Sequence, residues 1–277
     1  MPYERLRRVG LSLLLLSWGC GCAGPSKSLP ANPALPPTPV YVSKRQKPAN
    51  GPDREPLAEI LKKEGVDIST LENVYQAGGK NIYGLKVHGT GAVELWRKLR
   101  ALSEVTGRWP VIVGEAQGVD SHADSIGAQD KDSPQQVLAR AANLNAEAWF
   151  KKRQAENKQA QAEDPKASFE TGQWPASVQR LEHFTIPAEI LTGKPLPEVT
   201  LVLVPTKNPW EAPAWLMFGG WNECPLPEVQ VCLLKYWHAK YGAEVVGISH
   251  DIMEFEAARP PDRRKAALEL AREQFVY

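Results

Sequence analysis

The stretch Val199-Thr-Leu-Val-Leu-Val204 is the strongest indication of a fold in this chain of 277 residues. Nearly every residue in it is apolar, and a short continuous apolar run is typical of a strand that is buried on both faces. We therefore predict that these residues form a central strand of a β-sheet. The segments on either side of this strand indicate what the sheet packs against.

The segment Trp210-Glu-Ala-Pro-Ala-Trp-Leu-Met-Phe-Gly-Gly-Trp-Asn-Glu-Cys-Pro225 follows this strand, and we call it the Trp loop. It combines three tryptophans, two prolines and two adjacent glycines, a mixture that regular helices and strands do not tolerate. Aromatic-rich loops of this kind either pack a small core or bind a ligand. Since tryptophan and arginine commonly anchor binding surfaces, the candidate binding residues are Trp210, Trp215, Trp221, Asn222, Glu223 and Arg259.

Predicted helices and strands surround the Trp loop on both sides. Before it we predict a helix over 57–64, a hairpin of strands 73–76 and 81–87, a helix over about 91–106 and a strand over 109–113. After it we predict a helix that starts at Pro225 or Leu226 and ends at Lys240, strands over 244–249 and 252–257, and a closing helix. This order predicts an α+β fold in which helices pack on a mixed sheet. A strand–helix–strand unit over 81–113 suggests at least one parallel strand pair.

Residues 115–198 differ in composition and are predicted to form a helical insertion. Ser133-Pro134 is a good helix start, and an apolar stripe continues over Val137, Ala141, Leu144 and Ala148. Beyond Lys151 the apolar stripe ends. We therefore expect one helix that is packed in its first half and solvated in its second.

The N-terminus resembles a bacterial lipoprotein export signal. A segment with three arginines precedes the short apolar run Val9–Leu16, which is far below the roughly 20 residues needed to span a bilayer. A cysteine then follows a small residue at Cys20, or alternatively at Cys22, as lipid attachment requires. We predict a lipoprotein signal peptide over residues 1–19; an ordinary secretory signal that is cut near Ala23 is the alternative.

Residues 20–56 would then form the lipid attachment site and a tether. Nine of the 24 prolines lie between residues 24 and 56, with few large apolar residues among them, so this segment is predicted to stay extended without a core. We assign residues 57–277 to one compact domain. The chain is expected at the cell envelope, on the periplasmic side or the outer surface, held to the membrane by its lipid.

Composition excludes several kinds of protein. The net charge is +1, and residues 1–19 contain three arginines and one glutamate, so the remainder carries −1. No basic run with interleaved aromatic residues is present, and we expect no nucleic-acid partner. Two of the four cysteines lie at the export signal, which excludes a disulfide scaffold. The five histidines lack metal-site spacing, and Asp120-Ser-His-Ala-Asp124 is only a loose group, so we expect no metal and no cofactor.

Cys224 is the sharpest candidate for chemistry. Pro225 suits the first position of a helix, so Cys224 would lie at a helix N-terminus, where free N–H groups favour a thiolate. Its possible partners are His238 and the His250-Asp251 pair. With His250 as the base and Asp251 as the orienting carboxylate, this thiol would serve a hydrolase or transferase. The alternative is a small buried cysteine that locks the loop, which we favour because no local cysteine-protease signature is present.

Charged residues beside the apolar segments also have two interpretations. A buried pair between Arg259 and a carboxylate of Glu223 or Glu254 would fix the Trp loop. Alternatively, these charges form a polar patch that is rimmed by the three tryptophans and binds a partner.

The C-terminal part of the chain contains a series of distinctive motifs: Phe218-Gly-Gly-Trp-Asn-Glu-Cys-Pro225, Trp237-His-Ala-Lys-Tyr-Gly-Ala-Glu244, His250-Asp251, Glu254, Arg259-Pro-Pro261 and Ala271-Arg-Glu-Gln-Phe275. In these motifs the chain resembles the bacterial family known as domain of unknown function 4253. They cover about Val199–Tyr277, with a weaker similarity over 82–113. The resemblance implies a compact α/β domain, with no implied reaction or ligand.

We expect this protein to be a lipid-anchored binding module without catalytic activity. Its partner would be another protein, contacted through the face of the Trp loop, and a protective or immunity-type role is one form of this function. The alternative is a thiol-dependent hydrolase or transferase that uses Cys224 with His250 and Asp251.

Overall fold

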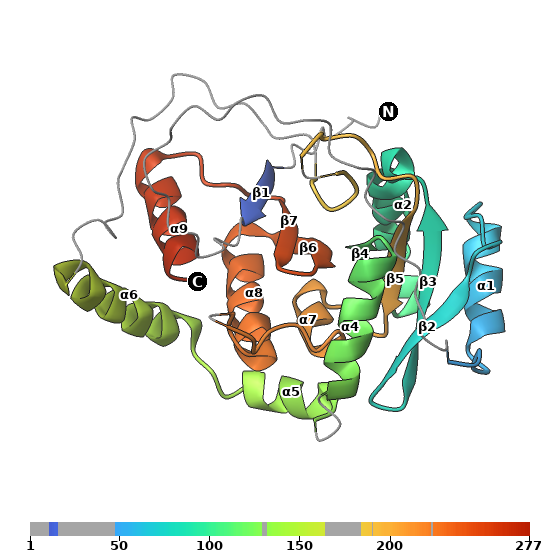
Figure 1. Ribbon diagram of the computed structural model, residues 1–277, viewed down its shortest axis with the longest axis horizontal. Helices are drawn as coiled ribbons and strands as arrows, with labels where there is room; N and C mark the ends of the chain where they lie inside the picture. Colours follow the sequence, from blue (N-terminus) through green and yellow to red (C-terminus); the bar gives the residue numbers. More distant parts are fainter. Residues whose placement is uncertain (1–10, 16–47, 129–131, 164–183, 190, 223) are drawn as a thin grey trace, which may run out of the picture.

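The computed structural model describes residues 11–15, 48–128, 132–163, 184–189, 191–222 and 224–277 (Figure 1). The predicted lipidation positions Cys20 and Cys22, most of the predicted tether and the candidate residue Glu223 lie outside the described residues. Among the described residues, no helix is both long enough and apolar enough to cross a membrane.

One mixed sheet organises the described part of the chain, with strand order β1-β7-β6-β4-β5-β3-β2. The strands are β1 (Leu11–Leu15), β2 (Glu72–Ala77), β3 (Lys80–Val87), β4 (Trp109–Gly114), β5 (Val199–Val204), β6 (Ala243–Ser249) and β7 (Ile252–Ala257). The prediction for 199–204 is confirmed: β5 lies between β3 and β4, and all six of its residues are buried. The predicted hairpin and the predicted strands around 109–113, 244–249 and 252–257 are also confirmed.

The parallel strand pair is not the one that the strand–helix–strand unit over 81–113 suggests. β3 and β4 run in the same direction but do not pair, because β5 lies between them and is antiparallel to both. The parallel pair is β4 with β6, joined at Ile112 and Gly247. Two strands that are far apart in the sequence therefore meet at the centre of the sheet.

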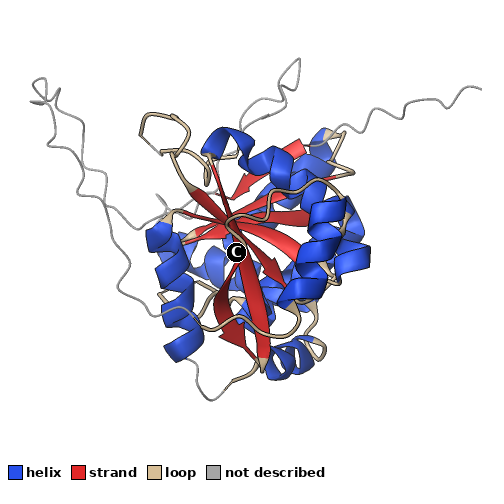
Figure 2. Ribbon diagram, turned by 90° about the vertical axis from the view of Figure 1, so that its right-hand side faces the viewer, coloured by secondary structure: helices blue, strands red, loops and turns tan. Residues whose placement is uncertain are grey.

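Helices lie on both sides of the sheet, and the predicted α+β class is confirmed (Figure 2). The helices are α1 (Arg54–Lys63), α2 (Gly89–Ala101), α3 (Ser103–Thr106), α4 (Ala116–Ala128), α5 (Pro134–Ala141), α6 (Ala146–Glu163), the 3₁₀ turn η2 (Pro209–Glu211), α7 (Ala212–Trp215), α8 (Pro227–Tyr241) and α9 (Arg264–Val276).

Two buried tryptophans contribute to the packing of the sheet and its helices. Trp96 of α2 donates a hydrogen bond to the Pro110 carbonyl at 3.0 Å, and Trp109 of β4 donates to the Val245 carbonyl at 2.9 Å. Their indole N–H groups are therefore satisfied while their rings fill the core.

The helical insertion differs from its prediction in two ways. Residues 116–128, where the predicted insertion specified no particular helix, form α4. The single helix predicted from Ser133 is two helices, because the Asn145 side chain accepts a hydrogen bond from the Ala148 N–H at 2.8 Å and so caps a new helix. The predicted stripe breaks at this point: Leu144 is 41% exposed, and α6 buries Ala146 and Phe150 instead. The helix start at Ser133 is confirmed, since Ser133 and Gln136 form a capping box.

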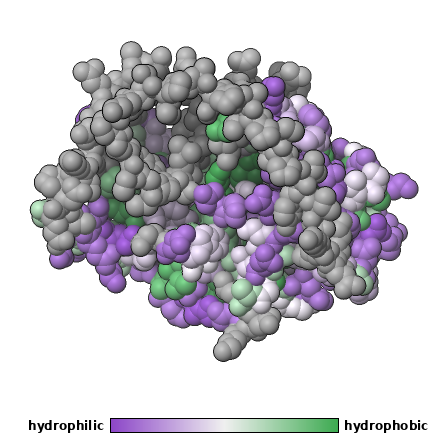
Figure 3. All heavy atoms as spheres, viewed as in Figure 1, coloured by the Kyte–Doolittle hydropathy of each residue, from purple (hydrophilic) through white to green (hydrophobic). Residues whose placement is uncertain are grey.

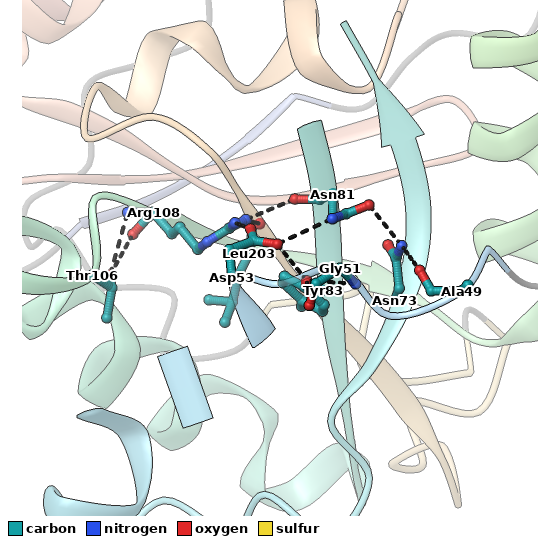
Figure 4. A network of polar contacts seen from close by, with 9 residues as sticks. All are labelled: Ala49, Gly51, Asp53, Asn73, Asn81, Tyr83, Thr106, Arg108 and Leu203. Atoms are coloured by element: carbon teal, nitrogen blue, oxygen red, sulfur yellow. Dashed lines mark hydrogen bonds and ion pairs between the residues drawn. The ribbon is translucent and has the colours of Figure 1, made fainter. Parts of the chain in front are cut away.

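The folded part begins before Leu57, so the boundary predicted for the tether is too late in the chain. The Asn73 side chain donates to the Ala49 carbonyl at 2.7 Å (Figure 4). The Asn73 N–H donates to the Asn50 side chain at 3.0 Å. Asp53 in turn accepts hydrogen bonds from Tyr83 and Arg108. These polar contacts fix residues that the proline content alone assigns to a spacer.

Candidate functional site

The Trp loop folds back on the start of α8 and requires unusual backbone conformations. Met217, Gly219, Gly220 and Asn222 all have positive φ angles, with Gly219 at +117°. A Cβ atom at Gly219 would lie 2.1 Å from the Pro225 carbonyl oxygen, so only glycine fits there. The Gly220 N–H donates to the Cys224 carbonyl at 3.2 Å, which closes the loop.

The three tryptophans of the loop do not form one exposed patch. Trp215 is only 4% exposed and belongs to the core. Trp221 is partly exposed and packs edge-to-face on Phe218, with ring centroids 5.0 Å apart. Trp210, also partly exposed, lies on the ring of His238 at 4.7 Å. Of the predicted binding residues of the loop that the structure describes, Trp210, Trp221 and the exposed Asn222 remain available to a partner.

Cys224 does not lie at a helix N-terminus, contrary to the sequence prediction. Helix α8 begins at Pro227 with Leu226 as its N-cap, so Cys224 precedes the cap and belongs to the loop. Its Sγ accepts a hydrogen bond of 3.4 Å from the side chain of Gln230, a fully buried residue. Burial raises the pKa of the Cys224 thiol, and this hydrogen bond offsets the increase only in part. The environment therefore favours the neutral thiol over a reactive thiolate.

His250 and Asp251 form the exposed turn between β6 and β7. The His250 Nδ1 lies 3.3 Å from the Ser121 hydroxyl of α4. Among the described residues, no hydrogen bond or ring contact joins His250 or Asp251 to Cys224. The His250 side chain instead borders a polar hollow of about 450 Å³, lined by Gln117, Asp120, Ser121, Asp124, Ser125, Ala128 and His250.

The loose Asp120–His122–Asp124 group is dispersed by its helical conformation. His122 points to the sheet, where its Nε2 donates to the Ile248 carbonyl at 2.8 Å, while Asp124 is exposed. Burial lowers the pKa of His122 to about 4, so its ring stays neutral. Within the described part of the chain, no group of three histidine, cysteine or acidic side chains is placed to hold a metal ion.

Arg259 and Glu254 do not form the buried ion pair considered above. Arg259 is exposed, and its guanidinium donates to the His238 and Ala239 carbonyls at 3.3 and 2.9 Å. It therefore caps the C-terminus of α8, where a positive charge is favourable. Glu254 is 1% exposed and accepts hydrogen bonds from Thr185 and Ile186.

A groove of about 580 Å³ lies between α5, α6, α8 and η2, and we call it the α5–α8 groove. Its lining comprises Leu138, Ala141, Ala142, Leu144, Asn145, Ala146, Glu147, Trp210, Glu211, Val231, Cys232, Lys235, Tyr236 and Ala239. Apolar surface bordered by hydrophilic residues is visible in this part of the molecule (Figure 3). Trp210 is the one predicted binding residue in this lining. Leu144 belongs to the apolar stripe that the sequence predicts to be packed, and the two asparagines on either side of it were the available signal of a break there.

The Trp210 side of the groove is held in place by polar contacts. Glu211 accepts hydrogen bonds from the Thr206 hydroxyl at 2.5 Å and from the Asn208 side chain at 2.8 Å. Because these contacts tie η2 to the end of β5, the Trp210 ring is presented to the groove by a fixed turn. Lys235, Glu147 and Glu211 place charges of both signs among the lining residues.

The part of the chain from β5 to α9 is similar to a known protein family. No curated protein and no solved structure matches the chain. One family match extends from β5 to α9, but β4 lies between β5 and β6, so the matched segment forms a continuous sheet only together with residues 109–114. Residues 200–277 match the family described as domain of unknown function (DUF4253), in agreement with the motifs identified between Phe218 and Phe275.

Proposed function

We propose that this protein is a non-catalytic binding module of the cell envelope, anchored by a lipid on Cys20 or Cys22, and that it contacts a partner protein through the α5–α8 groove. An immunity-type role, in which the bound partner is blocked or protected, is one form of this function. The proposed contact surface is the groove that Trp210 borders, and no longer the whole Trp loop.

The observation that carries the proposal is the lining of the groove. Leu144 is 41% exposed beside the partly exposed rings of Trp210 and Tyr236. Large apolar and aromatic side chains around a hollow, with charges at its margin, are the usual composition of a binding hot spot. Loss of water from such side chains would favour the docking of an apolar side chain of the partner.

The environment of Cys224 supports this proposal over the thiol enzyme. A catalytic cysteine needs a lowered pKa and a base within hydrogen-bond reach. Burial instead raises the pKa of Cys224, and the described contact of the thiol is with Gln230.

Site-specific photo-crosslinking in the producing cell tests the groove. A photoreactive amino acid at Leu144 should capture one discrete partner protein, which mass spectrometry then identifies. The same amino acid at Val105, which is 68% exposed on α3 and outside the groove lining, is the control. Equal capture of the same protein from both positions would contradict the proposal.

A matched pair of substitutions tests the groove with the purified partner. Ala142→Arg places a long charged side chain on the groove lining, whereas Ala101→Arg makes the same change at the exposed end of α2. Binding by the Ala142→Arg variant should be at least about tenfold weaker, which corresponds to ~1.4 kcal/mol, and that of the Ala101→Arg variant should match the unmodified protein. Unchanged affinity in Ala142→Arg would exclude the groove as the contact surface.

Metabolic labelling tests the anchor separately. Incorporation of radiolabelled palmitate should be lost in Cys20→Ser and kept in Cys22→Ser, or the reverse if Cys22 is the modified residue. Labelling that persists in the double variant, or that is absent from the unmodified protein, would contradict the lipid anchor.

A further inference from the structure

We propose that the outer edge of β7 is a strand-addition site, and that it takes an extended apolar segment of a partner protein once residues 1–19 have been removed. The inference rests on the proposed export of the chain. It concerns a different surface from the α5–α8 groove, so the two proposals can fail separately.

The pairing of β1 with β7 shows what this edge accepts. Leu11–Leu15, with the sequence Leu-Ser-Leu-Leu-Leu, lies antiparallel to β7, with pairs from Leu11↔Ala257 to Leu15↔Met253 (Figure 1). The register runs through five consecutive pairs without a shift. These same residues belong to the predicted signal peptide. Removal of residues 1–19 would therefore leave β7 as an edge strand with unpaired backbone groups.

The opposite edge of the sheet, formed by β2, is protected against strand addition. This difference between the β2 edge and the β7 edge supports the inference. β2 carries a register shift between Asn73 and Tyr75 in its pairing with β3. The segment before α1 also covers Asn73 of β2, which forms hydrogen bonds with Ala49 and Asn50. Bulges and covering segments are the usual means by which proteins prevent strand addition at an edge. β7 has no proline and no shift in its pairing with β1. Its pairing with β6 is shifted between Val245 and Gly247, but the extra residue belongs to β6, whereas the extra residue at the opposite edge belongs to the edge strand β2 itself.

The side chains of β7 are packed on both faces of the strand, which leaves its outer backbone edge as the surface for a partner. Met253 and Phe255 are buried in the core on one face. On the other face, the Glu254 carboxylate accepts hydrogen bonds from the Thr185 N–H at 2.5 Å, the Thr185 hydroxyl at 2.7 Å and the Ile186 N–H at 3.2 Å. Both faces of the strand are therefore occupied, and recognition would proceed through the main chain along the edge, as in other cases of strand addition.

A second copy of β7 fits this edge poorly. Suppose that two copies of β7 pair antiparallel over four or more residues, with side chains of the same face opposite each other. Glu254 then lies opposite Glu254 or Glu256 of the copy. Like charges directly opposite each other destabilise a strand pair. In the registers that are shifted by one residue, the carboxylates of Glu254 and Glu256 lie opposite the apolar face of the copy, which carries Met253 and Phe255. An uncharged apolar segment, such as β1 itself, avoids the repulsion between like charges.

The test uses the processed protein, extracted from the producing cell, and a synthetic peptide with the sequence of residues 9–16 flanked by lysines for solubility. Mass spectrometry first establishes that residues 1–19 are absent. Addition of the peptide should slow amide hydrogen exchange over 252–257 by about tenfold or more, while exchange over 72–77 stays unchanged. The same peptide with both Leu13→Pro and Leu14→Pro should bind about tenfold more weakly, because successive N–H groups of a strand point to opposite edges, so that one of these two faces β7, and proline has no N–H to donate.

Several outcomes would overturn the inference. These are retention of residues 1–19, unchanged exchange over 252–257, equal binding of the two peptides, and a protein dimer in which 252–257 is already protected. The Ala142→Arg variant separates this inference from the proposed function, because its change lies in the groove. It should bind the peptide as the unmodified protein does, whether or not it has lost the partner protein.

Discussion

The guanidinium of Arg108 lies 2.5 Å from the carboxylate of Asp53, and this pair joins the first folded residues to the start of the central strand β4 (Figure 4). Arg108 also donates to the carbonyls of Asn81 and Leu203, at 2.8 and 3.1 Å. Burial lowers the pKa of Arg108, and the charge of Asp53 opposes that effect. One buried cation therefore links α1, β3, β4 and β5.

Loss of this cation should destabilise the fold measurably. Arg108→Met would leave the Asn81 and Leu203 carbonyls without their donor, and we expect a loss of about 3 kcal/mol in the free energy of unfolding. The control is Arg97→Met, which removes an exposed pair with Glu256 at 3.4 Å and should cost less than about 1 kcal/mol. Urea unfolding measures both values. Equal losses in the two variants would show that the Arg108 network has no special role.

The sequence predicts those elements of the fold whose pattern is local. The continuous apolar run 199–204 and the capping box that starts at Ser133 both mark their own structure, and both predictions are confirmed. The position of β4 between β5 and β6 depends on contacts between distant segments. No pattern within Trp109–Gly114 specifies which strands will flank it, and so the parallel pair was misplaced.

The candidate site was less predictable, for a related reason. Composition identified Trp210, Trp215 and Trp221 equally, yet only packing decides that Trp215 enters the core. Cys224 lies two residues before the N-cap of α8 because the helix starts at Pro227 and not at Pro225. A shift of two residues at a helix start thus removed the electrostatic basis of the predicted thiolate.

The stability of the protein should fall as the pH is lowered from about 7 to 4, through His122. Burial lowers the pKa of this histidine to about 4, from the usual value of about 6.5. The unfolded chain therefore binds a proton below about pH 6.5 that the folded chain does not bind, and the expected loss approaches about 3 kcal/mol at pH 4. Urea unfolding at several pH values measures this slope.

Two variants isolate the contribution of His122. Burial raises the pKa of Glu254, which gives a contribution of opposite sign: folding favours its neutral form, so this residue adds stability as the pH falls. The slope should become steeper in Glu254→Gln and shallower in His122→Phe. An identical slope in His122→Phe and the unmodified protein would assign the pH dependence to other groups.

The two cysteines of the domain should be slow nucleophiles. Burial raises the pKa of both Cys224 and Cys232, and both thiols are partly buried. Alkylation of the folded protein at neutral pH should therefore be slower than that of a free cysteine, and it should accelerate on denaturation. His250→Ala should leave the rate at Cys224 unchanged. Rapid labelling of Cys224 below neutral pH, lost in His250→Ala, would support the enzyme interpretation instead.

The segment that matches the family should not fold by itself. Residues 200–277 supply β5, β6 and β7, but β5 and β6 are separated in the sheet by β4. Without β4, the inner edges of β5 and β6 would each lack a partner, and an open gap of this kind leaves backbone groups unpaired in the core. We expect a fragment of residues 200–277 to be unfolded by circular dichroism and amide exchange. A fragment of residues 48–277, which retains β4 and the Arg108 network, should unfold cooperatively. Cooperative unfolding of the 200–277 fragment would show instead that β5 and β6 can pair directly, and that the family domain is complete without the rest of this sheet.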